Sequence, residues 1–112
     1  MDRGQSLIIS PLFNGINYAY WKVRIRAFLQ SLDEKVWQAV EISWTKPKEA
    51  PTDWEDAKIK VANFNSKALN ALFSVVTNEE FKKISSTETA KEAWTILQTT
   101  YEGTKAIKDL KL

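Results

Sequence analysis

Acidic and hydroxyl side chains gather in TNEEFKKISSTETAKE, at residues 77–92. Adjacent carboxylates such as Glu79 and Glu80 can serve as general acid and base, and Ser or Thr hydroxyls as nucleophiles. Such nucleophiles need an activating base, and the 112-residue sequence has no His and no Cys. A Ser–Lys pairing stays open, although nothing resembles its motif. The acidic pair stands at a predicted helix N-terminus, where the helix dipole favours negative charge. We therefore predict no enzymatic activity, no metal site and no cofactor.

Aromatic and basic side chains occur together in FNGINYAYWKVRIR, at residues 13–26. An RNA-binding platform needs exposed rings interleaved with basic groups along one groove. Lys22, Arg24 and Arg26 alternate in sequence, so on a helix they spread over more than one side. RNA contact by these residues is one hypothesis, and a solvated surface is the other. Three tryptophans fall in apolar helical stripes, which favours a core role for Trp21, Trp54 and Trp94.

Composition indicates one globular domain. Apolar residues make up 44% and charged residues 27%, which is unlike the composition of a disordered chain. The formal charge of +2 is too small to indicate nucleic-acid or membrane binding by field strength. No apolar run approaches the roughly 20 residues that span a bilayer, and the N-terminus lacks signal-peptide features. We expect an intracellular protein with no membrane partner and no small-molecule substrate.

Capping signals predict an all-α fold, a bundle of about five to six helices. The Asn17 side chain is predicted to cap a first helix over about 18–31. Ile16 and Trp21 stand at the positions of a hydrophobic staple around that cap. Asp33 is predicted to cap a short second helix. The apolar edge of this second helix is Val36, Trp37 and Val40.

Three capping boxes, in which a Thr hydroxyl and a Glu carboxylate satisfy backbone N–H groups, mark the later helices. TDWE at residues 52–55 predicts a long helix over about 52–76, uninterrupted by Pro or Gly. TNEE at 77–80 predicts a short helix, and TAKE at 89–92 predicts another that Gly103 ends. The apolar face of the long helix is Trp54, Ala57, Val61, Phe64, Ala68, Leu72 and Val75, and that of the last is Ala90, Ala93, Trp94, Leu97 and Tyr101.

The two ends of the chain differ from its middle. Residues 1–16 are predicted to form an extended N-terminal arm and turn, and residues 17–112 a single helical domain. A free apolar arm must dock somewhere, either on its own domain or on a neighbouring molecule. Beyond Gly103 a helical pattern restarts and stops within about two turns. This pattern indicates a piece of a longer polypeptide, with a short docked terminal helix as the alternative.

Two blocks of the sequence carry a resemblance to a known family. FNGINYAYWKVRIRAFLQSL, at residues 13–32, resembles the opening of Gag polyproteins of plant copia-type LTR retrotransposons, with their F-x-G-x-N-Y-x-x-W pattern. The segment at residues 67–112 is similar to the family block built around K-A-L-N, an acidic-E-F-x-x-I turn, T-A-K-E-A-W-x-x-L and E-G-T. The resemblance covers nearly the whole chain.

The resemblance implies a retroviral-capsid-like N-terminal lobe. In such families Gag assembles into cytoplasmic virus-like particles around the element's RNA, and a second lobe and a zinc knuckle follow the first lobe. This sequence reaches Leu112 without either of them. Any contact with element RNA is therefore expected through the full-length Gag.

We accordingly predict a structural Gag lobe that forms homo-oligomers by self-association. One alternative is a domesticated, Gag-derived module that binds a protein or apolar peptide in a groove between helices. The other is an RNA-binding helical domain. The residues predicted to contact another copy or a partner are Leu7, Ile8, Ile9, Phe13, Tyr18 and Tyr20, and those predicted for RNA contact are Lys22, Arg24 and Arg26.

Overall fold

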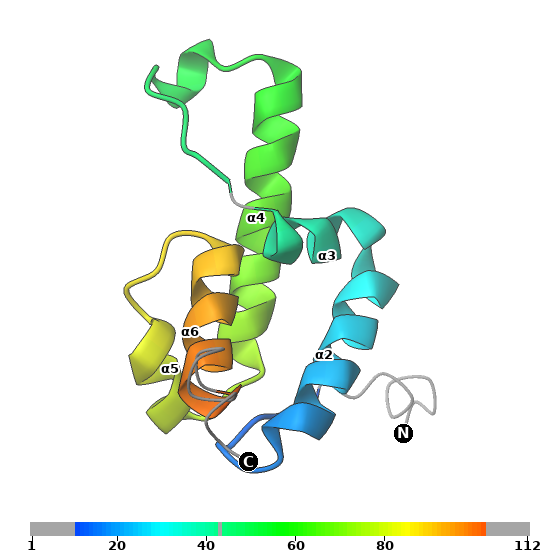
Figure 1. The fold of residues 1–112 in the computed structure, drawn as a ribbon. Coiled ribbons are helices and arrows are strands. Elements are labelled where there is room, and N and C mark those ends of the chain that lie inside the picture. Colours follow the sequence, from blue (N-terminus) through cyan, green and yellow to red (C-terminus); the bar gives the residue numbers. More distant parts are fainter. Residues whose placement is uncertain (1–10, 43, 103–112) are drawn as a thin grey trace, which may run out of the picture.

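The structure, a computed structural model, describes residues 11–42 and 44–102, and over these ranges it is all-α as predicted. Figure 1 shows α4 as the long central helix, with α2 and α3 on one side and α5 and α6 on the other. Two predictions concern residues outside these ranges: the arm contacts of Leu7, Ile8 and Ile9, and the helix beyond Gly103. The helices are α2 (Tyr18–Leu32), α3 (Glu34–Glu41), α4 (Asp56–Ser74), α5 (Asn78–Ile84) and α6 (Ala90–Glu102), with a 3-10 turn, η1 (Pro51–Asp53).

Helix α2 begins where predicted but by a different mechanism. Asn17 is the N-cap residue in the left-handed conformation, φ 59° and ψ 47°, which Asn tolerates better than most residues. Its side chain makes no capping bond, and its backbone carbonyl accepts from the N–H groups of Tyr20 and Trp21. The predicted staple is wrong, because Ile16 is 65% exposed. Trp21 is held instead by its indole Nε1, which donates to the Pro11 carbonyl at 2.8 Å.

Helix α3 confirms the sequence prediction. The Asp33 carboxylate accepts from the Lys35 backbone N–H at 2.8 Å, which satisfies a donor that the first turn leaves unpaired. The three apolar residues predicted for this helix are all buried: Val36, Trp37 and Val40.

Helix α4 starts later than predicted, at Asp56, because the TDWE box does not form. Pro51 has no N–H and a fixed φ, so it suits the first position of a helical turn, and residues 51–53 close as a 3-10 turn. Trp54 is then extended and leaves the predicted apolar face, and its indole donates to the Glu49 carbonyl at 2.9 Å. The long helix itself is confirmed over 19 residues.

The core covers only part of the predicted stripe on α4. Ala68 and Leu72 are fully buried, whereas Val61, two to three turns earlier, is 52% exposed. Figure 1 shows the reason, since the first half of α4 extends past the end of α3 together with the 44–53 connection. An apolar strip of α4 is therefore left facing solvent.

Helices α5 and α6 follow their predicted start signals in part. Thr77 is the N-cap of α5 without a side-chain bond, so the TNEE box does not form. At α6 the Thr89 hydroxyl accepts from the Glu92 N–H at 3.1 Å, as predicted. The Glu92 carboxylate accepts from the N–H of Glu88 at 3.2 Å, one residue before the expected donor. The predicted α6 face is confirmed: Ala90, Ala93 and Leu97 are buried, and Trp94 and Tyr101 are partly buried.

One buried amide joins α4 to the start of α6. Asn65 is 4% exposed, and its Nδ2 donates to the Glu88 carbonyl at 3.0 Å. Its Oδ1 accepts from the Ala90 backbone N–H at 2.9 Å. A single side chain on α4 thus satisfies two polar backbone groups at the beginning of α6, which fixes how the two helices meet.

Replacement of Asn65 by Ala should destabilise the domain, because both backbone groups lose their partner and the side-chain volume is left empty. We expect a loss of roughly 2–4 kcal/mol in the free energy of unfolding, measured by urea denaturation. Asn63→Ala, on an exposed position of the same helix, is the matched control and should change stability by less than about 0.5 kcal/mol. Equal effects of the two substitutions would contradict this role of Asn65.

Candidate interaction surfaces

The aromatic cluster of the N-terminal motif forms core, with Phe13 at its centre. Phe13 is 1% exposed, and its backbone N–H donates to the Val75 carbonyl at 2.7 Å. Its carbonyl accepts from the Thr77 N–H at 3.0 Å, completing a parallel β-bridge to Val76. The chain at residue 13 therefore docks on its own domain, at the α4–α5 junction.

Burial corrects the predicted partner contacts of Phe13 and Tyr18. Their rings pack edge to face with centroids 5.7 Å apart, and Tyr18 stacks on Tyr101 at 5.7 Å. Trp21 stacks on Phe13 at 4.7 Å and on Trp94 of α6 at 5.9 Å. Phe13 and Tyr18 therefore present almost no surface to a second molecule in this conformation. Of the predicted contact residues that the structure describes, Phe13, Tyr18 and Tyr20, only Tyr20 is in solvent, 74% exposed.

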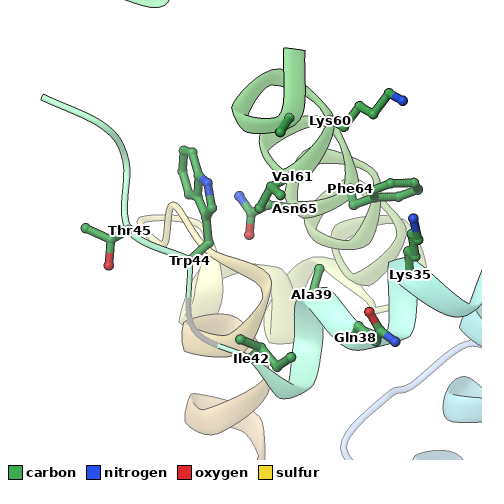
Figure 2. A pocket seen from close by; sticks show the side chains of 11 residues that line it. Lys35, Gln38, Ala39, Ile42, Trp44, Thr45, Lys60, Val61, Phe64 and Asn65 are labelled. Carbon is green, nitrogen blue, oxygen red and sulfur yellow. The ribbon is translucent and has the colours of Figure 1, made fainter. Parts of the chain in front are cut away.

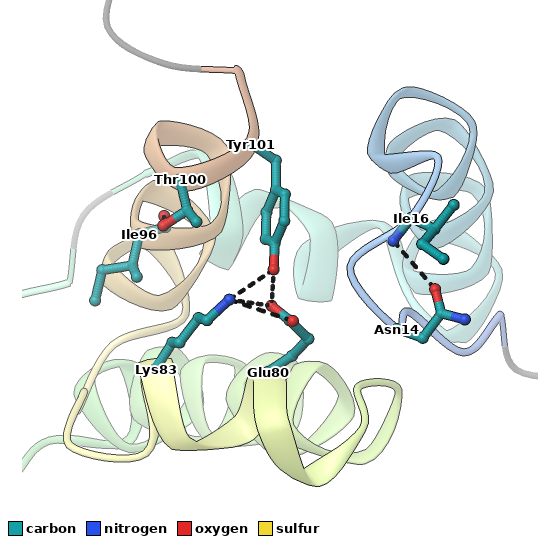
Figure 3. Close-up of polar contacts among 7 residues, drawn as sticks. All are labelled: Asn14, Ile16, Glu80, Lys83, Ile96, Thr100 and Tyr101. Atoms are coloured by element: carbon teal, nitrogen blue, oxygen red, sulfur yellow. Dashed lines mark hydrogen bonds and ion pairs between the residues drawn. The ribbon is translucent and has the colours of Figure 1, made fainter.

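A polar network that the sequence did not indicate lies beside this cluster (Figure 3). Glu80 of α5 is buried, and its carboxylate accepts from the hydroxyl of Tyr101 on α6. The Lys83 amine donates to the Tyr101 oxygen at 2.7 Å and to the two Glu80 oxygens at 3.2 and 3.3 Å. The predicted helix-dipole role accounts for the position of Glu80 in α5, but not for its burial. Its partners fix α5 against the last turns of α6.

Gly15 allows the N-terminal turn to approach this network. Its φ of +93° is a conformation that side chains disfavour, and a Cβ there would lie 3.0 Å from Glu80 Oε2 and 3.3 Å from the Tyr101 hydroxyl. Asn14 supports the same turn by accepting from the Ile16 N–H at 3.1 Å. The glycine of the motif is thus required both by the backbone angle and by the space.

Gly15→Ala should lower stability by roughly 1–3 kcal/mol, because Ala is strained at this φ and its methyl displaces the Glu80 carboxylate. Chemical denaturation measures the loss. In a Glu80→Ala background the closest contact is removed, while the strain and the 3.3 Å contact with the Tyr101 hydroxyl stay, so the same substitution should cost less there. An identical cost in both backgrounds would show that the contact with Glu80 plays no part.

The network also predicts lower stability in alkali. Burial and the hydrogen bond to Glu80 raise the pKa of Tyr101 above its ordinary value of 10.0, and the hydrogen bond to Tyr101 raises the pKa of Lys83. Both groups are favoured in their protonated forms, so their contribution is complete below pH 10 and is lost as the pH rises through the folded-state pKa values.

Tyr101→Phe should therefore be less stable than the wild type at neutral pH and lose less stability between pH 9 and about 11. Thermal unfolding across this pH range tests the difference. The decline should shrink without vanishing, because burial also raises the pKa of Tyr18. A parallel pH dependence of the two proteins would contradict the role given to Tyr101.

An apolar groove of about 510 Å³ lies between α3, the segment after it and the exposed first half of α4 (Figure 2). Trp44 and Thr45 border one side, and a smaller hollow of about 290 Å³ continues past Trp44 to Pro47 and Lys58. Asn65 lies at its base, turned toward the start of α6. The lining residues are Lys35, Gln38, Ala39, Ile42, Trp44, Thr45, Ala57, Lys60, Val61, Phe64 and Asn65.

A second apolar surface runs along the outer side of α2. Tyr20, Val23 and Ala27 follow one another at helical spacing, opposite the buried Trp21 and Ile25. Val23 is 66% exposed. We call these three residues the α2 outer face. Leu12 and Ile16, which precede the helix, are exposed as well.

The three residues predicted for RNA contact do not form one surface. Lys22 is paired with Glu102 of α6, and the guanidinium of Arg26 lies over the Trp37 ring, 5.3 Å from its centroid. Arg24 is exposed and points away from both. RNA contact by these residues stays a prediction.

Within the part of the chain that the structure describes, no group of three or more acidic, His or Cys side chains could hold a metal ion. None of the described helices is long and apolar enough to cross a membrane.

The described residues form an all-α domain with an apolar groove between α3 and α4 and exposed apolar side chains on α2. Two family models match the chain, both described as gag-polypeptide of LTR copia-type, one at residues 25–112 and one at residues 2–33. The chain therefore belongs to the copia-type LTR Gag polypeptides, a family with a structural role, and the resemblance of the two sequence blocks is confirmed. No significant match was found among curated proteins or among solved structures.

Proposed function

We propose that this domain is a capsid-forming lobe of a copia-type Gag and acts by self-association, building cytoplasmic virus-like particles around element RNA. The membership in the Gag family supports a structural role. The observation that carries self-association is the α2 outer face, where an aromatic and a β-branched side chain stand in solvent, with Tyr20 at 74% and Val23 at 66% exposure. Contiguous exposed apolar residues of this kind mark contact sites.

The charges on α2 indicate what sort of contact this is. Helix α2 carries Lys22, Arg24 and Arg26 and no acidic residue. Of these three, Arg24 stands beside the outer face, four residues after Tyr20, and two copies packed α2 against α2 would bring their Arg24 side chains together, which is unfavourable because both are positive. The outer face therefore meets a different surface of the neighbouring copy. Contacts between unlike surfaces are heterologous, and they generate rings or open arrays rather than closed pairs.

An acidic surface suited to this contact lies around the start of α4. Asp53 and Asp56 are exposed there, near Ile59, and neither carboxylate forms an ion pair with another described residue. In Figure 1 this region lies at the far end of α4, away from α2, so one copy can use both surfaces at once. Repetition of such a contact extends an assembly from copy to copy.

The double variant Tyr20→Asp, Val23→Asp should weaken self-association by at least about tenfold, because it removes the apolar contact and places charge in it. Sedimentation over a range of concentrations measures the effect. Thr95→Asp, at an exposed position on the side of α6 opposite its buried residues, is the control and should leave association unchanged. A wild-type chain that stays monomeric at millimolar concentration, or equal association of variant and wild type, would contradict the proposal.

A further inference from the structure

The groove between α3 and α4 has apolar walls and basic edges. Ile42 and Val61 expose 65% and 52% of their surface into or beside it. Lys35 of α3 and Lys60 of α4 line it, and no Asp or Glu is among its described lining residues. Neither lysine forms an ion pair with another residue of the described ranges. The groove thus combines open apolar area with positive charge.

The acidic residues close to the groove do not line it. Asp56 stands one helical turn before Lys60 on α4 and forms no ion pair with another described residue. Glu34 and Glu41 stand on α3 about a quarter-turn or more from the side that lines it. Glu49 pairs with Lys58 at 2.6 Å, at the smaller hollow beyond Trp44. Lys35 and Lys60 are therefore available to an incoming anionic group.

We propose that this groove binds a peptide segment of a partner protein in which large apolar side chains are flanked by carboxylates. The apolar side chains cover Ile42, Val61 and Trp44, and the carboxylates pair with Lys35 and Lys60. The volume of about 510 Å³ lies within the range of roughly 300–1,000 Å³ that is common for ligand sites. Segments that lay an apolar face into a helical groove are a recurring mode of peptide recognition.

Two other occupants fit the groove less well. RNA prefers successive open aromatic rings, but the Phe64 ring already has the Lys35 and Lys67 amines 5.9 and 5.7 Å from its centroid, and the other apolar walls are largely aliphatic. The chain's own last residues, GTKAIKDLKL at 103–112, carry three lysines and one aspartate. Their net charge is positive, like that of the groove, so the groove repels them. An acidic, apolar segment meets both properties of the lining.

The test uses the full chain and two short synthetic peptides that share their leucine positions, one with glutamate and one with lysine at the polar positions. NMR titration follows the indole signal of Trp44, and calorimetry gives the affinity. The glutamate peptide should shift the Trp44 signal and bind about tenfold more tightly than the lysine peptide. The double variant Lys35→Glu, Lys60→Glu should reverse this preference, and Val61→Asp should weaken binding of both peptides.

Several outcomes would overturn the proposal: equal binding of both peptides, binding that survives Val61→Asp, tighter binding of a peptide of residues 1–10, or displacement of the glutamate peptide by single-stranded RNA. The substituted side chains are exposed, and a thermal melt of each variant is the check that the fold is kept. The titrations are run at concentrations where sedimentation shows a monomer. The result therefore stands apart from the self-association proposed above.

Discussion

The backbone bridge between Phe13 and the α4–α5 junction is the contact on which the rest of this domain depends. Two hydrogen bonds, to Val75 and from Thr77, hold a segment that precedes α2 against residues more than 60 positions later. The Phe13 ring then completes the aromatic core that α2 and α6 share. Glycine is required at position 15, two residues after Phe13, because a side chain there would crowd the Glu80 carboxylate. The two blocks that resemble Gag thus pack against each other in one core, to which α3 also contributes.

This use of the aromatic residues decides which surfaces are left for function. Phe13, Tyr18 and Trp21 pack in the core rather than forming a ligand platform. Tyr20 stays outside because it lies away from the buried side of α2. The groove has a different origin, since α4 is longer than the core that α3 and α6 can cover. One surface is the outer side of a packed helix, and the other is the uncovered part of a long one. The two surfaces lie on different elements, and the acidic surface proposed to receive α2 stands beside the groove on α4.

Helices, core faces and family could be predicted from the sequence because they rest on local spacing, as the Asp33 cap and the α6 face show. The errors occur where a neighbouring residue or a distant contact competes with a local signal. At TDWE, Pro51 starts a 3-10 turn over residues 51–53, and the predicted capping box does not form. Asn17 adopts a left-handed conformation, and its side chain makes no capping bond. The burial of Glu80 and Asn65 depends on partners 21 and 25 residues away, for which the sequence carries no local signal.

Native-state hydrogen exchange of two backbone amides tests the central claim most directly. If the Phe13 bridge is part of the core, the N–H groups of Phe13 and Thr77 exchange only by global unfolding. Their free energies of exchange then equal those of buried helical amides such as Ile25 and Leu97. Exchange of Phe13 and Thr77 by local opening, several kcal/mol below those helical amides, would show that the N-terminal motif is an appendage and contradict the account.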